Sequence, residues 1–355
     1  MMIPTEPIGS IPRPPALMAA FAADGMPAEA REAAYRDAVR DTVRAMEATG
    51  SPVITDGEQG KYPSFWSYCL DGAANTVPEG FDIPYAAGHS RRLPRLTRGP
   101  FRYQRYADSY LRVAQGYARA AAVKQAIISP SALSMLYPAD PLPDYARDQF
   151  IDDLLAEHDT EIRRCLDAGA ASVQVDFVEG RLAMQLDPSG ELLNSFIDLN
   201  NMVLGRYGAA ERARLGVHTC PGSSYRAHGP AFDYADLLPS LFELEAGNFY
   251  IALAGEAEPE RVLKIVGQYV KPHQRVFIGV TAPSAAAVET PELVRDRVLR
   301  AARFIRPEQL GTTDDCGFAP CSSDHSASRA GAFAKIRARV EGTALAAAIL
   351  NGGAR

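Results

Sequence analysis

The sequence predicts an α/β fold, and specifically a single (β/α)8 TIM barrel with an irregular lid insertion. Strand-like apolar runs alternate with amphipathic helical runs along all 355 residues, a pattern typical of parallel α/β folds. Polar residues stand directly after the expected strands, at the face of a barrel where catalytic residues gather. Between strands and helices the chain lacks the Gly-x-Gly-x-x-Gly that a dinucleotide-binding sheet would need.

Each expected strand is a short apolar run that ends at a turn or a polar residue, and each expected helix has apolar residues at helical spacing. In chain order we expect strands at 3–8, 52–55, 124–128, 171–176, 214–217, 249–253, 275–280 and 309–312. We expect helices at 27–49, 107–122, 145–168, 192–207, 234–244, 259–269, 291–304 and 330–350. Gly50 follows the first of these helices, as is common where a helix ends.

Residues 61–106 interrupt this alternation. They are rich in Tyr, Pro and Gly, and we expect a lid or long loop with one hairpin around 93–105. Barrels with such insertions routinely exceed about 250 residues. We therefore expect residues 1–355 to form a single domain.

Composition limits the classes of partner. The net charge of −6 and the pI of about 5.6 argue against nucleic-acid binding, which would need a basic patch. No apolar run approaches the roughly 20 residues of a membrane helix, and residues 1–6 lack the form of a signal peptide. We expect a cytoplasmic protein that acts on small molecules. The sequence leaves the oligomeric state open, with a homodimer as one option.

A zinc site is predicted by His218 and Cys220, which lie in the segment 216–222 at the end of an expected strand. An imidazole and a thiolate are natural Zn²⁺ ligands, and Cys316, after another expected strand, can supply the third. In a barrel these strand ends share one face. Three protein ligands leave a fourth position for a substrate. Cys321 is a rival fourth ligand that would close the site, although its spacing from Cys316 is not that of a zinc knuckle.

Two carboxylates also follow expected strands, Glu58 and Asp176. Taken singly, each is as readily explained as a helix cap or an ion-pair partner. Taken as a set facing a metal, they can hold the ammonium group of a substrate. The backbone at Gly9 and Ser10 can offer donors to a substrate carboxylate.

These segments resemble the catalytic barrel of cobalamin-independent methionine synthase and its single-barrel relatives. Residues 5–13 (TEPIGSIPR) are similar to the opening segment of that family, and residues 56–58 (DGE) and 173–176 (VQVD) to its substrate-binding motifs. Residues 218–220 (HTC) and 315–317 (DCG) are similar to its zinc-ligand motifs.

The resemblance implies roles for these residues. Ile8, Gly9 and Ser10 would contact homocysteine, and Glu58 and Asp176 would hold its amino-acid group. The zinc ligands would be His218, Cys220 and Cys316.

The chain departs from the family at three points. Ala252 stands where the family has a Glu ligand to zinc, and Glu256 or Cys321 is then an alternative fourth ligand. Phe177 replaces the acidic residue that usually follows the Gln-x-Asp aspartate. We also expect no counterpart of the N-terminal barrel of full-length enzymes. A His, Cys, Cys set without the Glu also resembles epoxyalkane:coenzyme M transferase.

Together these features predict a zinc-dependent thiol alkyltransferase that transfers a methyl group to the thiol of homocysteine. Its partners would be a small-molecule thiol acceptor and an alkyl donor. Two alternatives stay open: alkylation of another thiol, as in epoxyalkane:coenzyme M transferase, and a non-catalytic zinc-binding relative. Hydrolysis by a zinc-bound water is disfavoured, because zinc with thiolate ligands is a poor Lewis acid toward water.

Overall fold

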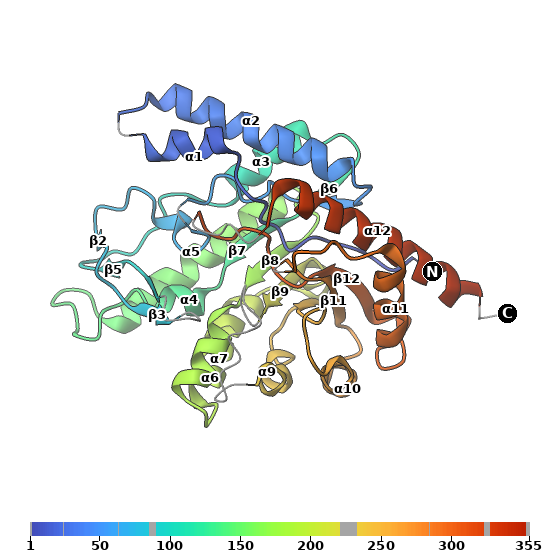
Figure 1. The fold of residues 1–355 in the computed structure, drawn as a ribbon. Coiled ribbons are helices and arrows are strands. Elements are labelled where there is room, and N and C mark those ends of the chain that lie inside the picture. Colours follow the sequence, from blue (N-terminus) through green and yellow to red (C-terminus); the bar gives the residue numbers. More distant parts are fainter. Residues whose placement is uncertain are drawn as a thin grey trace.

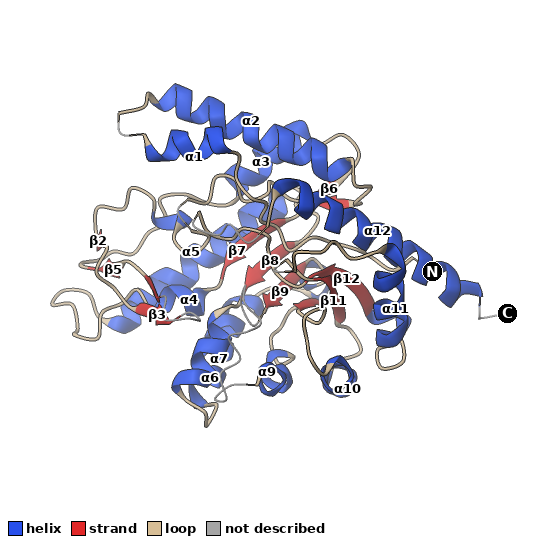
Figure 2. Cartoon of the chain, in the orientation of Figure 1, coloured by secondary structure: helices blue, strands red, loops and turns tan. Residues whose placement is uncertain are grey.

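A parallel sheet of six strands forms the centre of the protein, with helices around it (Figures 1 and 2). The computed structural model describes residues 2–23, 25–62, 64–84, 90–220, 233–283, 285–322 and 327–352. The sheet has the order β12-β11-β10-β9-β8-β7. Its strands are β7 (Gln125–Ile128), β8 (Val173–Asp176), β9 (Leu215–Thr219), β10 (Asn248–Ile251), β11 (Arg275–Thr281) and β12 (Leu310–Asp314). All six predicted strands of this region are confirmed within a few residues.

The N-terminal part of the predicted sheet is less regular. A separate parallel pair joins β1 (Val53–Ile54) to β6 (Ala122–Val123). The expected strand at 3–8 is not formed as a strand; Thr5 instead makes an isolated parallel bridge to Thr312 of β12. Proline explains the difference, because Pro4 and Pro7 flank the bridge and have no N–H to extend a ladder.

The eight predicted helices are confirmed, with ends shifted by a few residues. They are α2 (Ala28–Glu47), α3 (Asp108–Tyr117), α5 (Arg147–Asp167), α7 (Glu191–Leu204), α9 (Tyr234–Leu241), α10 (Pro259–Tyr269), α11 (Pro291–Ala301) and α12 (Arg329–Gly352). Short helices that were not predicted are α1 (Pro15–Ala22), α4 (Pro130–Ser134), α6 (Glu179–Leu186) and α8 (Ala209–Arg212). Side-chain caps set several starts, as where Thr290 accepts a hydrogen bond from the Leu293 N–H at the start of α11.

The predicted lid is irregular, but its hairpin was placed too late in the sequence. Antiparallel pairs join β2 (Thr76–Val77) to β5 (Arg95–Leu96) and β3 (Asp82–Pro84) to β4 (Ser90–Arg92). A 3-10 helix, η1 (Tyr68–Leu70), precedes them. Residues 97–106 contain no strand. Leu93 and Leu96 are buried beside these pairs, so the apolar residues that suggested a hairpin at 93–105 mark its second half.

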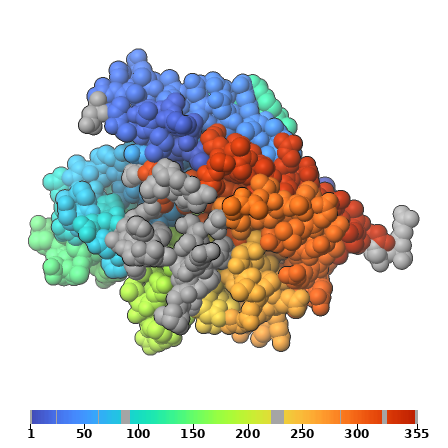
Figure 3. Space-filling model, in the orientation of Figure 1, coloured from blue at the N-terminus to red at the C-terminus, as the bar shows by residue number. Residues whose placement is uncertain are grey.

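The two ends of the described chain lie side by side, with α2 beside α12 (Figure 1), and their atoms meet on the surface in Figure 3. Arg329 of α12 donates hydrogen bonds to the Pro12 carbonyl and the Thr42 hydroxyl. Deeper in α12, the fully buried Arg339 donates from Nε to Asp314 of β12 at 3.1 Å and from Nη1 to Thr5 at 2.6 Å. Arg339 therefore ties α12, β12 and the N-terminal segment together.

Among the residues that the structure describes, no helix is both long enough and apolar enough to cross a membrane.

Replacing Arg339 with Met should lower the free energy of unfolding by about 3–5 kcal/mol, because the Asp314 carboxylate would stay buried without its cation. Arg337 lies two residues away on the exposed face of the same helix. R337M should therefore change stability by no more than about 0.5 kcal/mol. Urea unfolding followed by circular dichroism measures both. Equal effects of the two substitutions would contradict this role of Arg339.

Candidate metal centre

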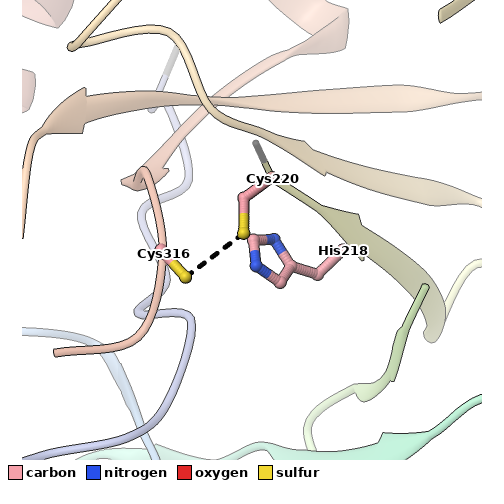
Figure 4. Close-up of side chains that lie close together, drawn as sticks. All are labelled: His218, Cys220 and Cys316. Carbon is pink, nitrogen blue, oxygen red and sulfur yellow. Dashed lines mark hydrogen bonds between the residues drawn. The ribbon is translucent and has the colours of Figure 1, made fainter. Parts of the chain in front are cut away.

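Three metal-binding side chains meet at the ends of two strands. His218 lies on β9, Cys220 follows that strand, and Cys316 follows β12 (Figure 4). One ligand atom from each residue lies within 4.8 Å of the other two. The two sulfur atoms are 3.2 Å apart. His218 and Cys220 are buried and Cys316 is partly buried. Residues 221 and 222 of the predicted motif lie outside the described residues.

The backbone of β10 orients the imidazole. His218 Nδ1 lies 3.3 Å from the Tyr250 carbonyl oxygen. A carbonyl oxygen only accepts, so this bond requires the proton on Nδ1 and leaves the Nε2 lone pair for a metal. Metal-ligating histidines typically have their other ring nitrogen bonded in this way.

The charges of the cluster are coupled. Burial lowers the pKa of His218, but the hydrogen bond to Cys220 and the nearby charges of Cys220 and Asp176 outweigh it, and the net shift is upward. The hydrogen bond with Cys220, together with burial, raises the pKa of Cys316 well above its usual range. Without a cation the set therefore retains protons, and a cation would release them.

The donor set fits zinc. Two thiol sulfurs and one imidazole nitrogen are the ligands that Zn²⁺ prefers, and a set of three leaves one coordination position for an exogenous ligand. Ala252, directly after β10, is fully buried and offers no ligand atom. Among the described residues, neither Glu256 nor Cys321 joins the three-residue set.

The second group of predicted residues lies around Glu58. Its φ of +55° is rare outside glycine, and such strained residues cluster at functional sites. Its Oε1 accepts a hydrogen bond at 2.9 Å from the ammonium group of Lys61, which is fully buried. Burial lowers the pKa of Lys61, but the charges of Glu58, Asp176 and Asp56 raise it by more. Lys61 thus lies among three carboxylates, a neighbour that the sequence analysis missed.

Asp176 links this group to the metal-binding side chains. It is the last residue of β8 and pairs in register with His218 of β9. Gln174 donates from Nε2 to Asp176 Oδ1 at 2.7 Å and to the Ile8 carbonyl at 3.2 Å. Burial raises the pKa of Asp176 to about 6, against the opposing effect of the His218 charge. Phe177, which follows it, is fully buried and adds no charge.

The segment Ile8–Ser10 reaches the same place. An added Cβ on Gly9 would lie 3.7 Å from Glu58 Oε1, and one on Gly317 would lie 2.1 Å from Ser10 Oγ. Ser10 Oγ accepts from the Ala319 N–H at 3.1 Å, so Ser10 packs on the turn after Cys316. All the predicted site residues therefore gather at one end of the sheet.

The fold is an α/β fold with thiol and imidazole side chains gathered at the strand ends. A family model described as "Cobalamin-independent synthase, Catalytic domain" matches residues 3–337. The chain belongs to this family, whose members are enzymes of the methyltransferase type.

Two relatives are similar in sequence along most of their length. The uncharacterized protein YxjH of Bacillus subtilis is 23% identical over 337 residues, covering 89% of this chain and 86% of YxjH. A methionine synthase of Thermococcus kodakarensis is 24% identical over 321 residues, covering 89% and 87%. The B12-independent methionine synthase from Shewanella sp. W3-18-1, solved with selenomethionine, shares the fold with a TM-score of 0.73 at 17% identity, covering 99% of this chain and 100% of that one.

Replacing Cys316 with Ser should abolish stoichiometric zinc binding, because a hydroxyl is a much poorer ligand for this metal than a thiolate. Protein purified with zinc and dialysed against a weak chelator should hold one Zn²⁺ per chain, and C316S much less. Metal content by mass spectrometry makes the comparison. C321S is the matched control and should keep its zinc; loss of zinc from C321S alone would favour the closed site.

Proposed function

We propose that the protein is a zinc-dependent thiol alkyltransferase that transfers a methyl group to the thiol of homocysteine. The meeting of His218, Cys220 and Cys316, with ligand atoms within 4.8 Å of one another, carries this proposal. Family membership and the methionine synthases among its relatives support it.

The carboxylates next to the metal ligands would bind the acceptor. Glu58 and Asp176 would hold its ammonium group, and both belong to a cluster that is almost closed to water. The turn at Ile8, Gly9 and Ser10 lies between Glu58 and the Cys316 segment, where backbone groups can contact the acceptor carboxylate. These contacts would place the acceptor sulfur at the coordination position that His218, Cys220 and Cys316 leave free.

Zinc, when bound by these three residues, favours the thiolate form of the acceptor at neutral pH. A free thiol has a pKa of roughly 8.5, so only a few per cent is thiolate in water. The thiol proton leaves to solvent when the thiolate forms. The acceptor sulfur then forms a bond to the methyl carbon while the bond from that carbon to the donor breaks, and the donor keeps the electron pair of that bond and takes up a proton from solvent.

We further propose that the sheet closes into the predicted (β/α)8 barrel and that residues 1–355 form one cytoplasmic domain. Three hydrogen bonds support closure at the N-terminal side. Glu6 N–H donates to the Thr312 carbonyl, the Thr55 hydroxyl donates to the Gly9 carbonyl, and Lys124 N–H donates to the Ile54 carbonyl. The segment at 3–9, β1 and the start of β7 would thus complete the barrel.

The ion pair of Glu58 bears on a second acceptor class. Glu58 already has a cation, the buried ammonium of Lys61 at 2.9 Å. An acceptor without an ammonium group, as in the epoxyalkane:coenzyme M transferase that the ligand set also resembles, would leave this ion pair undisturbed. Coenzyme M carries a sulfonate in place of the amino-acid group, and Glu58 and Asp176 would repel it.

Calorimetric titration of the zinc-loaded protein separates these acceptors. Homocysteine should bind with release of close to one proton per site, measured by repeating the titration in buffers of different ionisation enthalpy, because the thiol ionises on binding. Coenzyme M should not bind. The reverse result would establish the second acceptor class. If the protein binds zinc but neither thiol releases a proton when it is added, the alkyltransferase is rejected and the non-catalytic zinc-binding relative is favoured.

Replacing Asp176 with Asn should raise the KM for homocysteine about 10- to 100-fold, because a hydrogen bond between charged groups is worth about 1.5–3 kcal/mol. Steady-state assays of methyl transfer measure this change. The control is E157Q, which alters a buried carboxyl that accepts from the Tyr103 N–H and the Tyr106 hydroxyl. An unchanged KM in D176N would exclude Asp176 from acceptor binding.

A further inference from the structure

The loop after β10 supplies no metal ligand, yet it contacts the segments that carry both cysteines. Its residues Ala252–Gly255 lie between Thr219, which precedes Cys220, and Asp315, which precedes Cys316. On the Cys220 side, the Tyr234 hydroxyl lies 3.3 Å from the Thr219 carbonyl, to which it donates, and accepts from the Ala252 N–H at 3.2 Å. The loop thus has contacts on both sides.

On the Cys316 side, a carboxylate holds the loop. Asp315 Oδ1 accepts from the N–H groups of Leu253 and Ala254, each at 2.8 Å, and Oδ2 accepts from that of Gly255 at 2.9 Å. Three successive backbone donors therefore converge on one carboxylate. Hydrogen bonds to an ionised acceptor are roughly twice as strong as neutral ones, and Asp315 is fully buried.

The sheet itself leaves room for this carboxylate. A Cβ on Gly279 of β11 would lie 1.8 Å from Asp315 Oδ1, so any other residue at this position would displace it. The Asp315 N–H also donates to the Thr281 carbonyl at 2.9 Å. Contacts with β11 and with the loop after β10 thus fix both the backbone and the side chain of Asp315. This residue directly precedes Cys316.

We propose that Asp315 is a positioning residue for zinc. Its carboxylate fixes the Cys316 sulfur relative to Cys220 by accepting hydrogen bonds from the loop after β10, which itself supplies no metal ligand. The proposal rests on the proposed zinc site. Cys316 lies on an irregular segment after β12, and its own strand does not determine where its sulfur lies. The Asp315 contacts supply that constraint, and the Tyr234 hydroxyl ties the same loop to the Cys220 segment.

Replacing Asp315 with Asn tests the proposal. The amide keeps one oxygen acceptor but presents an N–H₂ donor toward one of the three N–H groups, and it removes the charge. Zinc affinity, measured by competition with a chromogenic chelator, should fall about 10- to 100-fold, the usual effect of losing a group that orients a metal ligand. The ligand field absorption of the Co²⁺-substituted protein should shift as well, because the cysteine geometry is altered.

Two further variants separate positioning from stability. G279A leaves Asp315 chemically intact but displaces its carboxylate, and it should weaken zinc binding in the same direction. E157Q is again the matched control: Glu157 of α5 is also a buried carboxyl that accepts a backbone N–H, from Tyr103. E157Q should lower thermal stability without changing zinc affinity.

The outcomes are distinct. Zinc affinity and Co²⁺ spectra of D315N and G279A that match the wild type would overturn the positioning role while leaving the zinc site intact. An equal loss of affinity in E157Q would also overturn it, because the effect would then follow general destabilisation. Failure of the wild-type protein to bind zinc would instead reject the proposed function.

Discussion

The approach of the segments that follow β9 and β12 is the constraint on which the site depends. Two strands, β10 and β11, separate β9 from β12. With neighbouring strands about 4.8 Å apart, the ends of β9 and β12 would be roughly 14 Å apart in a flat sheet. The sulfur atoms of Cys220 and Cys316, which follow those two strands, are 3.2 Å apart. The segments that follow β9 and β12 therefore lead toward each other, as they would in the barrel proposed above.

The remaining polar residues lie at the same end of the sheet. Asp176 at the end of β8 lies beside His218, and the Ile8–Ser10 segment reaches both Glu58 and the turn after Cys316. Three carboxylates, those of Asp56, Glu58 and Asp176, surround the single ammonium group of Lys61, so negative charge is in excess there. Such a site favours a zwitterionic amino acid, whose ammonium group is attracted, over a sulfonate.

The sequence predicted most of the elements and the three side chains that meet after β9 and β12, because both leave strong local signals. Helical spacing located α2 and α5, and His218, Cys220 and Cys316 are soft ligands placed directly after apolar runs. Other features depend on tertiary contacts that no short pattern records. The flanking prolines keep the bridge at Thr5 from extending into a strand. These prolines are visible in the sequence, but the apolar run around them is typical of a strand.

Lys61 and Asp315 are two further residues whose roles depend on tertiary contacts that the sequence pattern does not reveal. Lys61 follows Glu58 by three residues and would pass for a surface lysine, yet it is fully buried. Asp315 stands next to a predicted ligand, but its role depends on N–H groups about sixty residues away. Gly279, within an apolar strand, would have been the best clue, since glycine inside a strand often marks a close approach.

The most direct test of this account is X-ray absorption at the zinc edge, with and without the acceptor thiol. Zinc in the resting protein should have two sulfur ligands at about 2.3 Å and one nitrogen at about 2.0–2.1 Å. Homocysteine should add a third sulfur, as its thiolate takes the open position. Four sulfur or nitrogen ligands from the protein alone, unchanged when the thiol is added, would contradict the central claim.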